Sequence, residues 1–195
     1  MLFTEWIQEV YTSYLTAIYE MADPRTAEWL LVKSPLYPSL ILLCYVYFCV
    51  NSRTLTARMP AYKLRPVLIL YNLFMVILSS YMVVEFFLTA YLLNYTLTCQ
   101  SMEYDSSALP MRMARVCWLY YFSKYLELFE TVLFALRKKY NQITFLHVYH
   151  HCSIIFFWWL GMKYLAGGTC KNKLAYKNLL ELKQHLFACF LPKLC

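Results

Sequence analysis

Long apolar stretches separated by short charged connections run through most of the chain. A helix of roughly 20 residues crosses a hydrocarbon core about 30 Å thick. Four stretches are long enough, at residues 34–52, 66–93, 115–136 and 141–162. The pattern predicts an all-α fold, a polytopic membrane helical bundle with about four spans, within a transmembrane domain at 34–165.

The charges of the connections predict the direction of these spans. Cytosolic connections carry an excess of lysine and arginine. We therefore place the first and third connections in the cytosol, and residues 1–33 and the loop at 94–113 in the lumen. Asn94-Tyr95-Thr96, a glycosylation sequon, falls on the predicted lumenal side. The basic residues are Arg53, Arg58, Lys63, Arg65, Arg137, Lys138 and Lys139, and the lumenal acids are Glu5, Glu9, Glu20, Asp23, Glu28, Glu103 and Asp105.

The composition supports a membrane protein and argues against two other classes. Hydrophobic residues make up 61% of the chain and charged residues 15%, against roughly 45–50% and about 25% in soluble domains. The net charge is +7, but the bases form short clusters between apolar stretches, so a nucleic-acid partner is not expected. The eight cysteines form no CxxC pair, which argues against a zinc site. Cys99 is expected in an oxidising loop.

Ionisable residues inside the third stretch need partners, because each costs roughly 2.5–3.5 kcal/mol in a membrane span. Spacings of three and four place Lys124, Glu127 and Thr131 along one helical face, and Glu130 lies close to it. Two interpretations stay open: a buried intrahelical Lys–Glu pair, or the wall of a polar chamber. Glu85 in the second stretch could pair with Lys124, line the same chamber or have a structural role.

The fourth stretch contains the string HVYHH, with His147, His150 and His151. Positions i, i+3 and i+4 share one helix face, so three imidazoles project into the same space. Three such residues are hard to explain as ordinary core histidines. Iron binding, as in membrane desaturases and hydroxylases, needs more imidazoles than this chain has, and the fourth, His185, lies in the tail. The pattern favours acyl chemistry, in which a neutral imidazole acts as base or nucleophile.

At these residues the sequence resembles the very-long-chain fatty acid elongase family. KYLELFET (Lys124–Thr131) matches the family's KxxExxDT box, with Glu130 in place of aspartate, and HVYHH matches its HxxHH box. The likeness runs from about residue 20 to Thr169. It implies a seven-helix fold for a full-length member, in the endoplasmic reticulum membrane with a lumenal N-terminus.

The resemblance also implies a reaction and roles for residues. Family members are condensing acyltransferases that join malonyl-CoA to a long-chain acyl-CoA, release carbon dioxide and CoA, and yield β-ketoacyl-CoA. No metal or other cofactor is expected, and the partners would be the lipid bilayer and other enzymes of the microsomal elongation cycle. By position, His150 would take the acyl chain as an acyl-imidazole, supported by His147 and His151. Lys124, Glu127 and Glu130 would order the polar end of the chamber.

The same resemblance suggests a function for one basic cluster. Arg137, Lys138 and Lys139 could contact the phosphates of CoA. The topology signal explains these residues equally well.

Residues 166–195 are expected to be a divergent tail outside the family. After Thr169 the sequence lacks the HxxMY-type and TxxQxxQ boxes, so we expect a truncated gene model, a retained intron or a splice variant. Residues 174–191 could form an amphipathic helix on a membrane surface. Two further hypotheses are an inactive elongase fragment without its own catalysis and a metal-dependent membrane oxidase or desaturase. Acyl chain length, saturation preference and oligomeric state are not determined by the sequence.

Overall fold

The computed structural model describes residues 2–16, 22–94, 107–164 and 166, and their regular structure is helical, without strands. The sequon residues Tyr95 and Thr96, together with Cys99, Glu103 and Asp105, lie outside these ranges, as do Glu20 and the tail at 167–195 with His185. The helices are α1 (Leu2–Leu15), α2 (Leu36–Leu55), α3 (Arg65–Leu92), α4 (Ala108–Leu136), the short 3₁₀ helix η2 (Tyr140–Gln142) and α5 (Phe145–Tyr164).

Each predicted span corresponds to a helix, but the ends differ where charges were taken as boundaries. α4 begins at Ala108 instead of residue 115 and continues through Arg112, which pairs with α3. α5 begins later than expected because residues 140–142 form the 3₁₀ helix η2. It also continues through Lys163, whose ammonium group donates to the Lys33 carbonyl at 3.0 Å. A charge ends an apolar run in the sequence, but it does not end a helix when its partner is nearby.

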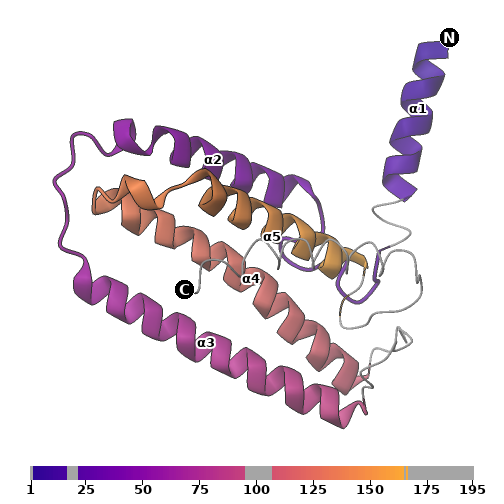
Figure 1. Ribbon diagram of the computed structural model, residues 1–195. Coiled ribbons are helices and arrows are strands. Elements are labelled where there is room, and N and C mark those ends of the chain that lie inside the picture. The colour runs from indigo at the N-terminus through magenta and orange to yellow at the C-terminus, as the bar shows by residue number, and fades with distance from the viewer. Residues whose placement is uncertain (1, 17–21, 95–106, 165, 167–195) are drawn as a thin grey trace.

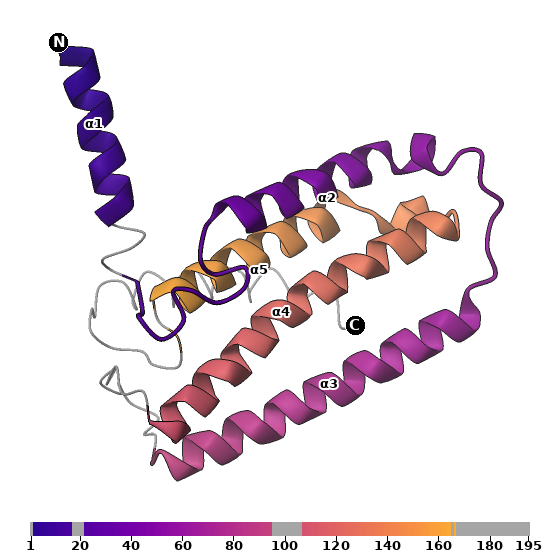
Figure 2. The ribbon, with the colours of Figure 1, turned by 180° about the vertical axis from the view of Figure 1, so that it is seen from behind.

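The helix α1 was not predicted, because residues 1–33 were assigned only as a lumenal segment. Its sequence signal is the spacing of Ile7, Val10, Tyr11 and Tyr14, which is typical of one helical face. Both views show α1 apart from the other helices (Figures 1 and 2).

α4 is the central helix of the bundle. It contacts α2, α3, α5 and η2, with α2 and α5 side by side along it and α3 on the outside (Figures 1 and 2). The charged third span therefore lies where protein can surround it, as the cost of charge in lipid requires.

α3 is largely unburied, and only Met82 and Thr89 on it are fully covered. Ile69 and Leu70 are each 69% exposed, which suits lipid better than water. Among the described helices, α3 is the one whose length and composition alone allow it to cross a membrane. Crossing by α2, α4 and α5 therefore stays a prediction.

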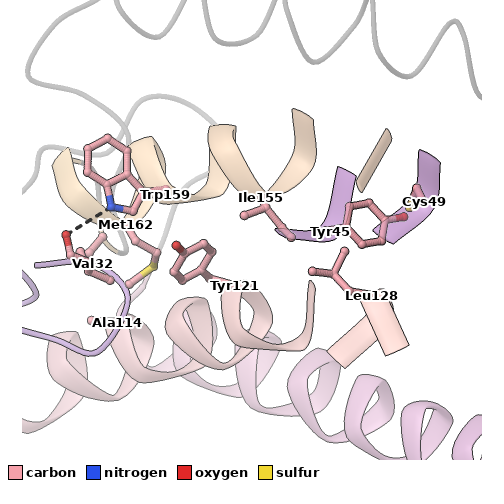
Figure 3. Close-up of a cluster of buried hydrophobic side chains, with 10 residues drawn as sticks. Val32, Tyr45, Cys49, Ala114, Tyr121, Leu128, Ile155, Trp159 and Met162 are labelled. Atoms are coloured by element: carbon pink, nitrogen blue, oxygen red, sulfur yellow. Dashed lines mark hydrogen bonds between the residues drawn. The ribbon is translucent and has the colours of Figure 1, made fainter. Parts of the chain in front are cut away.

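Buried side chains from α2, α4 and α5 form the core, with Tyr121 and Ile155 near its middle and Trp159 at the end beside Val32 (Figure 3). Trp159 donates its indole N–H to the Val32 carbonyl at 3.3 Å, drawn as the dashed line in Figure 3. The segment before α2 thus covers one end of α5.

Different segments of the chain form the two ends of the bundle, and the first and third connections share one end, as their charges predict. At one end, the backbone N–H of Asp23 donates to the Lys163 carbonyl at 2.8 Å. At the other end, the first and third connections touch, because the N–H of Tyr62 donates to the Leu136 carbonyl at 3.2 Å. The two basic connections therefore lie together, away from the N-terminal segment. Which end faces the cytosol stays a prediction.

Candidate active site

The three histidines of α5 lie together on one face. The ring centroids of His147 and His151 are 4.6 Å apart, and those of His150 and His151 are 5.4 Å apart. His151 is only 4% exposed, while the other two are half-buried. The arrangement expected from the i, i+3, i+4 spacing is present, and its innermost member, His151, is shielded by its neighbours.

Lys124 and Glu127 of α4 face the histidine cluster as an ion pair. The ammonium Nζ of Lys124 donates to Oε1 of Glu127 at 2.5 Å and lies 4.5 Å from the centroid of the Tyr120 ring. Both charges are within electrostatic range of His150. The intrahelical pair therefore exists and lies next to the histidines, so the two interpretations left open by the sequence are compatible.

Glu130 is less closely integrated with these residues. It is half-buried and makes no ion pair or side-chain hydrogen bond with another described residue. Its charge acts on Tyr71 of α3, whose ring packs against Phe129 at 6.2 Å between centroids. Glu130 lies within electrostatic range of Glu127. Its catalytic role stays a prediction.

A chain of hydroxyl groups reaches the histidine cluster from two other helices. Nε2 of His147 is 2.9 Å from Oγ1 of Thr131 on α4, and that oxygen is 3.1 Å from the Tyr45 hydroxyl on α2. The rings of Tyr45 and His151 meet edge to face with centroids 6.1 Å apart. Sequence reasoning placed Thr131 on the right face but missed Tyr45. The available signal was a tyrosine inside an apolar span, since a buried phenol needs a hydrogen-bond partner.

Glu85 has a partner that the sequence analysis did not name. Arg112 of α4 binds it with two contacts, Nη2 to Oε2 at 2.8 Å and Nε to Oε1. Pairing with Lys124 is wrong, because α3 and α4 are antiparallel neighbours and Glu85 lies near the end of α3, opposite the start of α4. Twelve helical residues, about 18 Å, separate Arg112 from Lys124. Glu85 therefore joins two helices outside the histidine cluster.

The basic residues of the third connection have mixed surroundings. Nζ of Lys138 contacts the Thr56 carbonyl, whereas Lys139 is exposed. The Thr56 hydroxyl is 2.7 Å from that of Tyr140, and the Arg53 guanidinium lies 5.5 Å from the Tyr140 ring centroid. The Thr56 hydrogen bond, with Lys138 and Arg53, lowers the pKa of Tyr140 below its ordinary value. The predicted CoA contacts of Arg137, Lys138 and Lys139 stay a prediction.

The described part of the chain has no group of three or more His, Cys, Asp or Glu side chains placed to hold a metal ion. His185 lies outside that part. The expectation that no metal or cofactor takes part therefore stays a prediction.

An apolar pocket of about 280 Å³ adjoins the charged pair between α3, α4 and α5. Tyr120 forms the link, because its ring lies under Lys124 and also contacts Trp158 of α5 at 4.4 Å between centroids. The polar cluster and an apolar space therefore meet at one side chain. The pocket is lined by Ser79, Met82, Val83, Phe86, Phe87, Val116, Cys117, Tyr120 and Trp158.

The described helices, one of them long and apolar enough to cross a membrane, define together with this cluster an all-α membrane protein with a histidine-bearing site. Residues 30–177 match the model of the ELO family, described as the GNS1/SUR4 family. The chain belongs to this family, and its match extends past Thr169, where the recognised motifs end.

Similar proteins support the same assignment. The chain is 42% identical over 176 residues to very long chain fatty acid elongase 7 of Rattus norvegicus, covering 89% of this chain and 61% of that protein. It is 43% identical over 162 residues to very long chain fatty acid elongase 1 of Homo sapiens, covering 82% and 58%. With very long chain fatty acid elongase 4 of Mus musculus it shares 40% over 151 residues, covering 77% and 48%. The chain thus spans about half to three-fifths of the length of these relatives.

Proposed function

We propose that this chain carries the histidine site of a fatty acid elongase condensing enzyme, a very-long-chain β-ketoacyl-CoA synthase. Its substrates would be malonyl-CoA and a long-chain acyl-CoA. The observation that supports this most strongly is the cluster of His147, His150 and His151 beside the Lys124–Glu127 pair. The names of the relatives, very long chain fatty acid elongases, agree with the proposal.

The proposed reaction begins with His150 as the nucleophile. A ring nitrogen of His150 attacks the thioester carbonyl of acyl-CoA, the carbon–sulfur bond breaks, and CoA leaves with a proton as its free thiol. The acyl-imidazole keeps the acyl carbon activated. Malonyl-CoA then loses carbon dioxide, and the electron pair of the broken carbon–carbon bond forms an enolate. The enolate carbon attacks the acyl carbon, the carbon–nitrogen bond breaks, and β-ketoacyl-CoA is released. The ring nitrogen that is set free takes up one proton, which comes from the solvent and replaces the proton that left with CoA, so His150 returns to its neutral form.

The surroundings of His150 suit both halves of this reaction. An enolate is stabilised by donors fixed nearby in a site that excludes water. Lys124 supplies a cation, and burial shields His151 from water. The pocket of about 280 Å³ beyond Tyr120 has the apolar lining that part of an acyl chain requires.

The proposal includes a location and an orientation. The protein would lie in the endoplasmic reticulum membrane with its N-terminus in the lumen and the two basic connections in the cytosol. Exposed Lys139 would then meet CoA phosphates on the side from which CoA arrives. Other enzymes of the microsomal elongation cycle would receive the β-ketoacyl-CoA product.

Incorporation of radiolabelled malonyl-CoA into β-ketoacyl-CoA by membranes tests the proposal. Two proteins are compared, this chain alone and this chain joined to the C-terminal part of rat very long chain fatty acid elongase 7. We expect His150→Ala to lower product formation by at least about a hundredfold, because the nucleophile is lost. Tyr149→Ala is the control, since Tyr149 neighbours His150 on α5 but is 50% exposed.

The outcomes separate the alternatives. Product from the joined protein alone supports the site and shows that this chain has no catalysis of its own. Product that is unaffected by His150→Ala contradicts the role of His150. Absence of product from both proteins contradicts the proposed function.

A further inference from the structure

The first helix of the bundle contributes a side chain to the histidine cluster. Tyr45 lies on α2, which carries neither of the two sequence boxes, yet its ring packs against His151. Its hydroxyl group is 3.1 Å from Oγ1 of Thr131, and that oxygen is 2.9 Å from Nε2 of His147. One line of polar atoms thus joins α2, α4 and α5.

Burial makes this line specific. Thr131 is 0% exposed and Tyr45 is 7% exposed, so neither hydroxyl can rely on water. A buried hydroxyl without a partner is costly, so each group in the line needs its neighbour. The Tyr45 hydroxyl also lies beside the thiol of Cys49, but sulfur is a weak acceptor, so the Thr131 oxygen is the stronger partner. Because Thr131 has one hydroxyl proton, it donates toward one neighbour and accepts from the other.

The donor and acceptor strengths decide the direction of the line. A phenol is a stronger donor than an aliphatic hydroxyl, and a neutral imidazole nitrogen is the strongest acceptor of the three groups. Tyr45 therefore donates to Thr131, and Thr131 donates to Nε2 of His147. The neutral ring of His147 must then carry its proton on Nδ1.

We propose that Tyr45 is a positioning residue, which acts through Thr131 to hold the neutral His147 ring as the Nδ1–H tautomer. In this state the lone pair of Nε2 accepts from Thr131 and does not abstract a proton. The consequence for turnover, which rests on the proposed function, is that His147 does not act as a general base through Nε2. General base catalysis would be left to another group.

The ¹⁵N spectrum of the histidine side chains of this 195-residue chain, in lipid nanodiscs at a pH where the imidazoles are neutral, tests the tautomer. Protonated and unprotonated ring nitrogens give distinct resonances, and His147→Asn identifies the signals of His147. We expect a predominant Nδ1–H form in the unmodified chain.

Removing the first donor should change that preference. In Tyr45→Phe the Thr131 hydroxyl can donate to a backbone carbonyl of α4 and accept a hydrogen bond from Nε2–H of His147. The population of the Nε2–H tautomer should therefore rise severalfold. Thr131→Val should act in the same direction, and Thr131→Ser should keep the unmodified spectrum. Tyr47→Phe is the matched control, because Tyr47 lies on α2 but is 63% exposed.

The result can overturn the inference without reference to activity. A predominant Nε2–H form in the unmodified chain contradicts it, as does a spectrum that Tyr45→Phe leaves unchanged. Far-UV circular dichroism confirms that the variants keep their helices. Because the spectrum needs no turnover, failure of the tautomer prediction and failure of the malonyl-CoA experiment are separate results.

Discussion

Single side chains show how the bundle handles polar groups away from water. Glu85 is neutralised by Arg112 across two helices, and Lys124 by Glu127 within one. The Nδ1 atom of His151 differs, because it is buried without a hydrogen-bond partner in the described part of the chain. An unmet buried polar atom costs about 1–3 kcal/mol, and a catalytic role is one of the explanations for such an atom. The catalytic role of the histidine face stays a prediction.

Trp159 is the side chain at which we expect the largest loss of stability. It is 5% exposed and belongs to the core, and Trp159→Ala would leave a cavity, so the free energy of unfolding should fall by about 3–5 kcal/mol. Equilibrium unfolding in mixed micelles, followed by circular dichroism, measures this change. Phe156→Ala is the control, because Phe156 is 51% exposed on the same helix and should cost about 0.5 kcal/mol or less. Equal effects of the two changes would contradict the described core.

At the scale of elements, the two basic connections act as one unit. The Thr56 carbonyl accepts from Lys138, and the Thr56 hydroxyl meets that of Tyr140. These contacts join the end of α2 to the turn between α4 and α5. The histidine face of α5 is therefore held against α4 and α2 from a point close to its own start.

The titration of Tyr140 tests this unit. The Thr56 hydrogen bond lowers the pKa of Tyr140, assisted by Lys138 and Arg53, because these groups favour the phenolate. Thr56→Val should therefore raise the pKa of Tyr140 toward its ordinary value. Thr54→Val, at an exposed position, should leave it unchanged. The phenolate absorbance, taken as the difference from the matching Tyr140→Phe protein, gives the pKa.

The same pKa shift has a consequence for stability. A tyrosine whose pKa is lower in the folded than in the unfolded state contributes stability fully above its unfolded pKa. That contribution is lost as the pH falls through the folded pKa.

If Thr56→Val left the pKa of Tyr140 unchanged, the hydrogen bond between the Thr56 and Tyr140 hydroxyl groups would be absent.

At the scale of the whole molecule, the helices carry the two basic connections to one end and residues 22–34 to the other (Figures 1 and 2). In a membrane these ends would face opposite compartments. The prediction can be checked with single cysteines in a chain whose eight native cysteines are replaced.

A membrane-impermeant maleimide added to sealed microsomes should distinguish the two ends. We expect Arg58→Cys and Lys139→Cys to react at once and Glu28→Cys to react only after permeabilisation, since all three positions are exposed. Reaction of all three from the same side would contradict the arrangement. Reaction of Arg58→Cys and Lys139→Cys from opposite sides would contradict it too.

Local features of the site could be predicted because they depend on helical geometry alone. The spacing of His147, His150 and His151 places them on one face in any α-helix, whatever lies opposite. The apolar runs likewise predict where α2, α3, α4 and α5 occur, and the charges predict which connections lie together. These properties need only the backbone period and the chain's local composition.

Contacts between helices were decided by the tertiary structure. Tyr45 and Thr131 are 86 residues apart, and Glu85 and Arg112 are 27 apart. No local rule selects one such partner among many, because the choice depends on how the helices are paired and rotated. The sequence by itself therefore determined the helices α2, α3, α4 and α5, the histidine face and the family. Packing alone decided that α2 reaches that face, and that Glu85 binds Arg112 instead of Lys124.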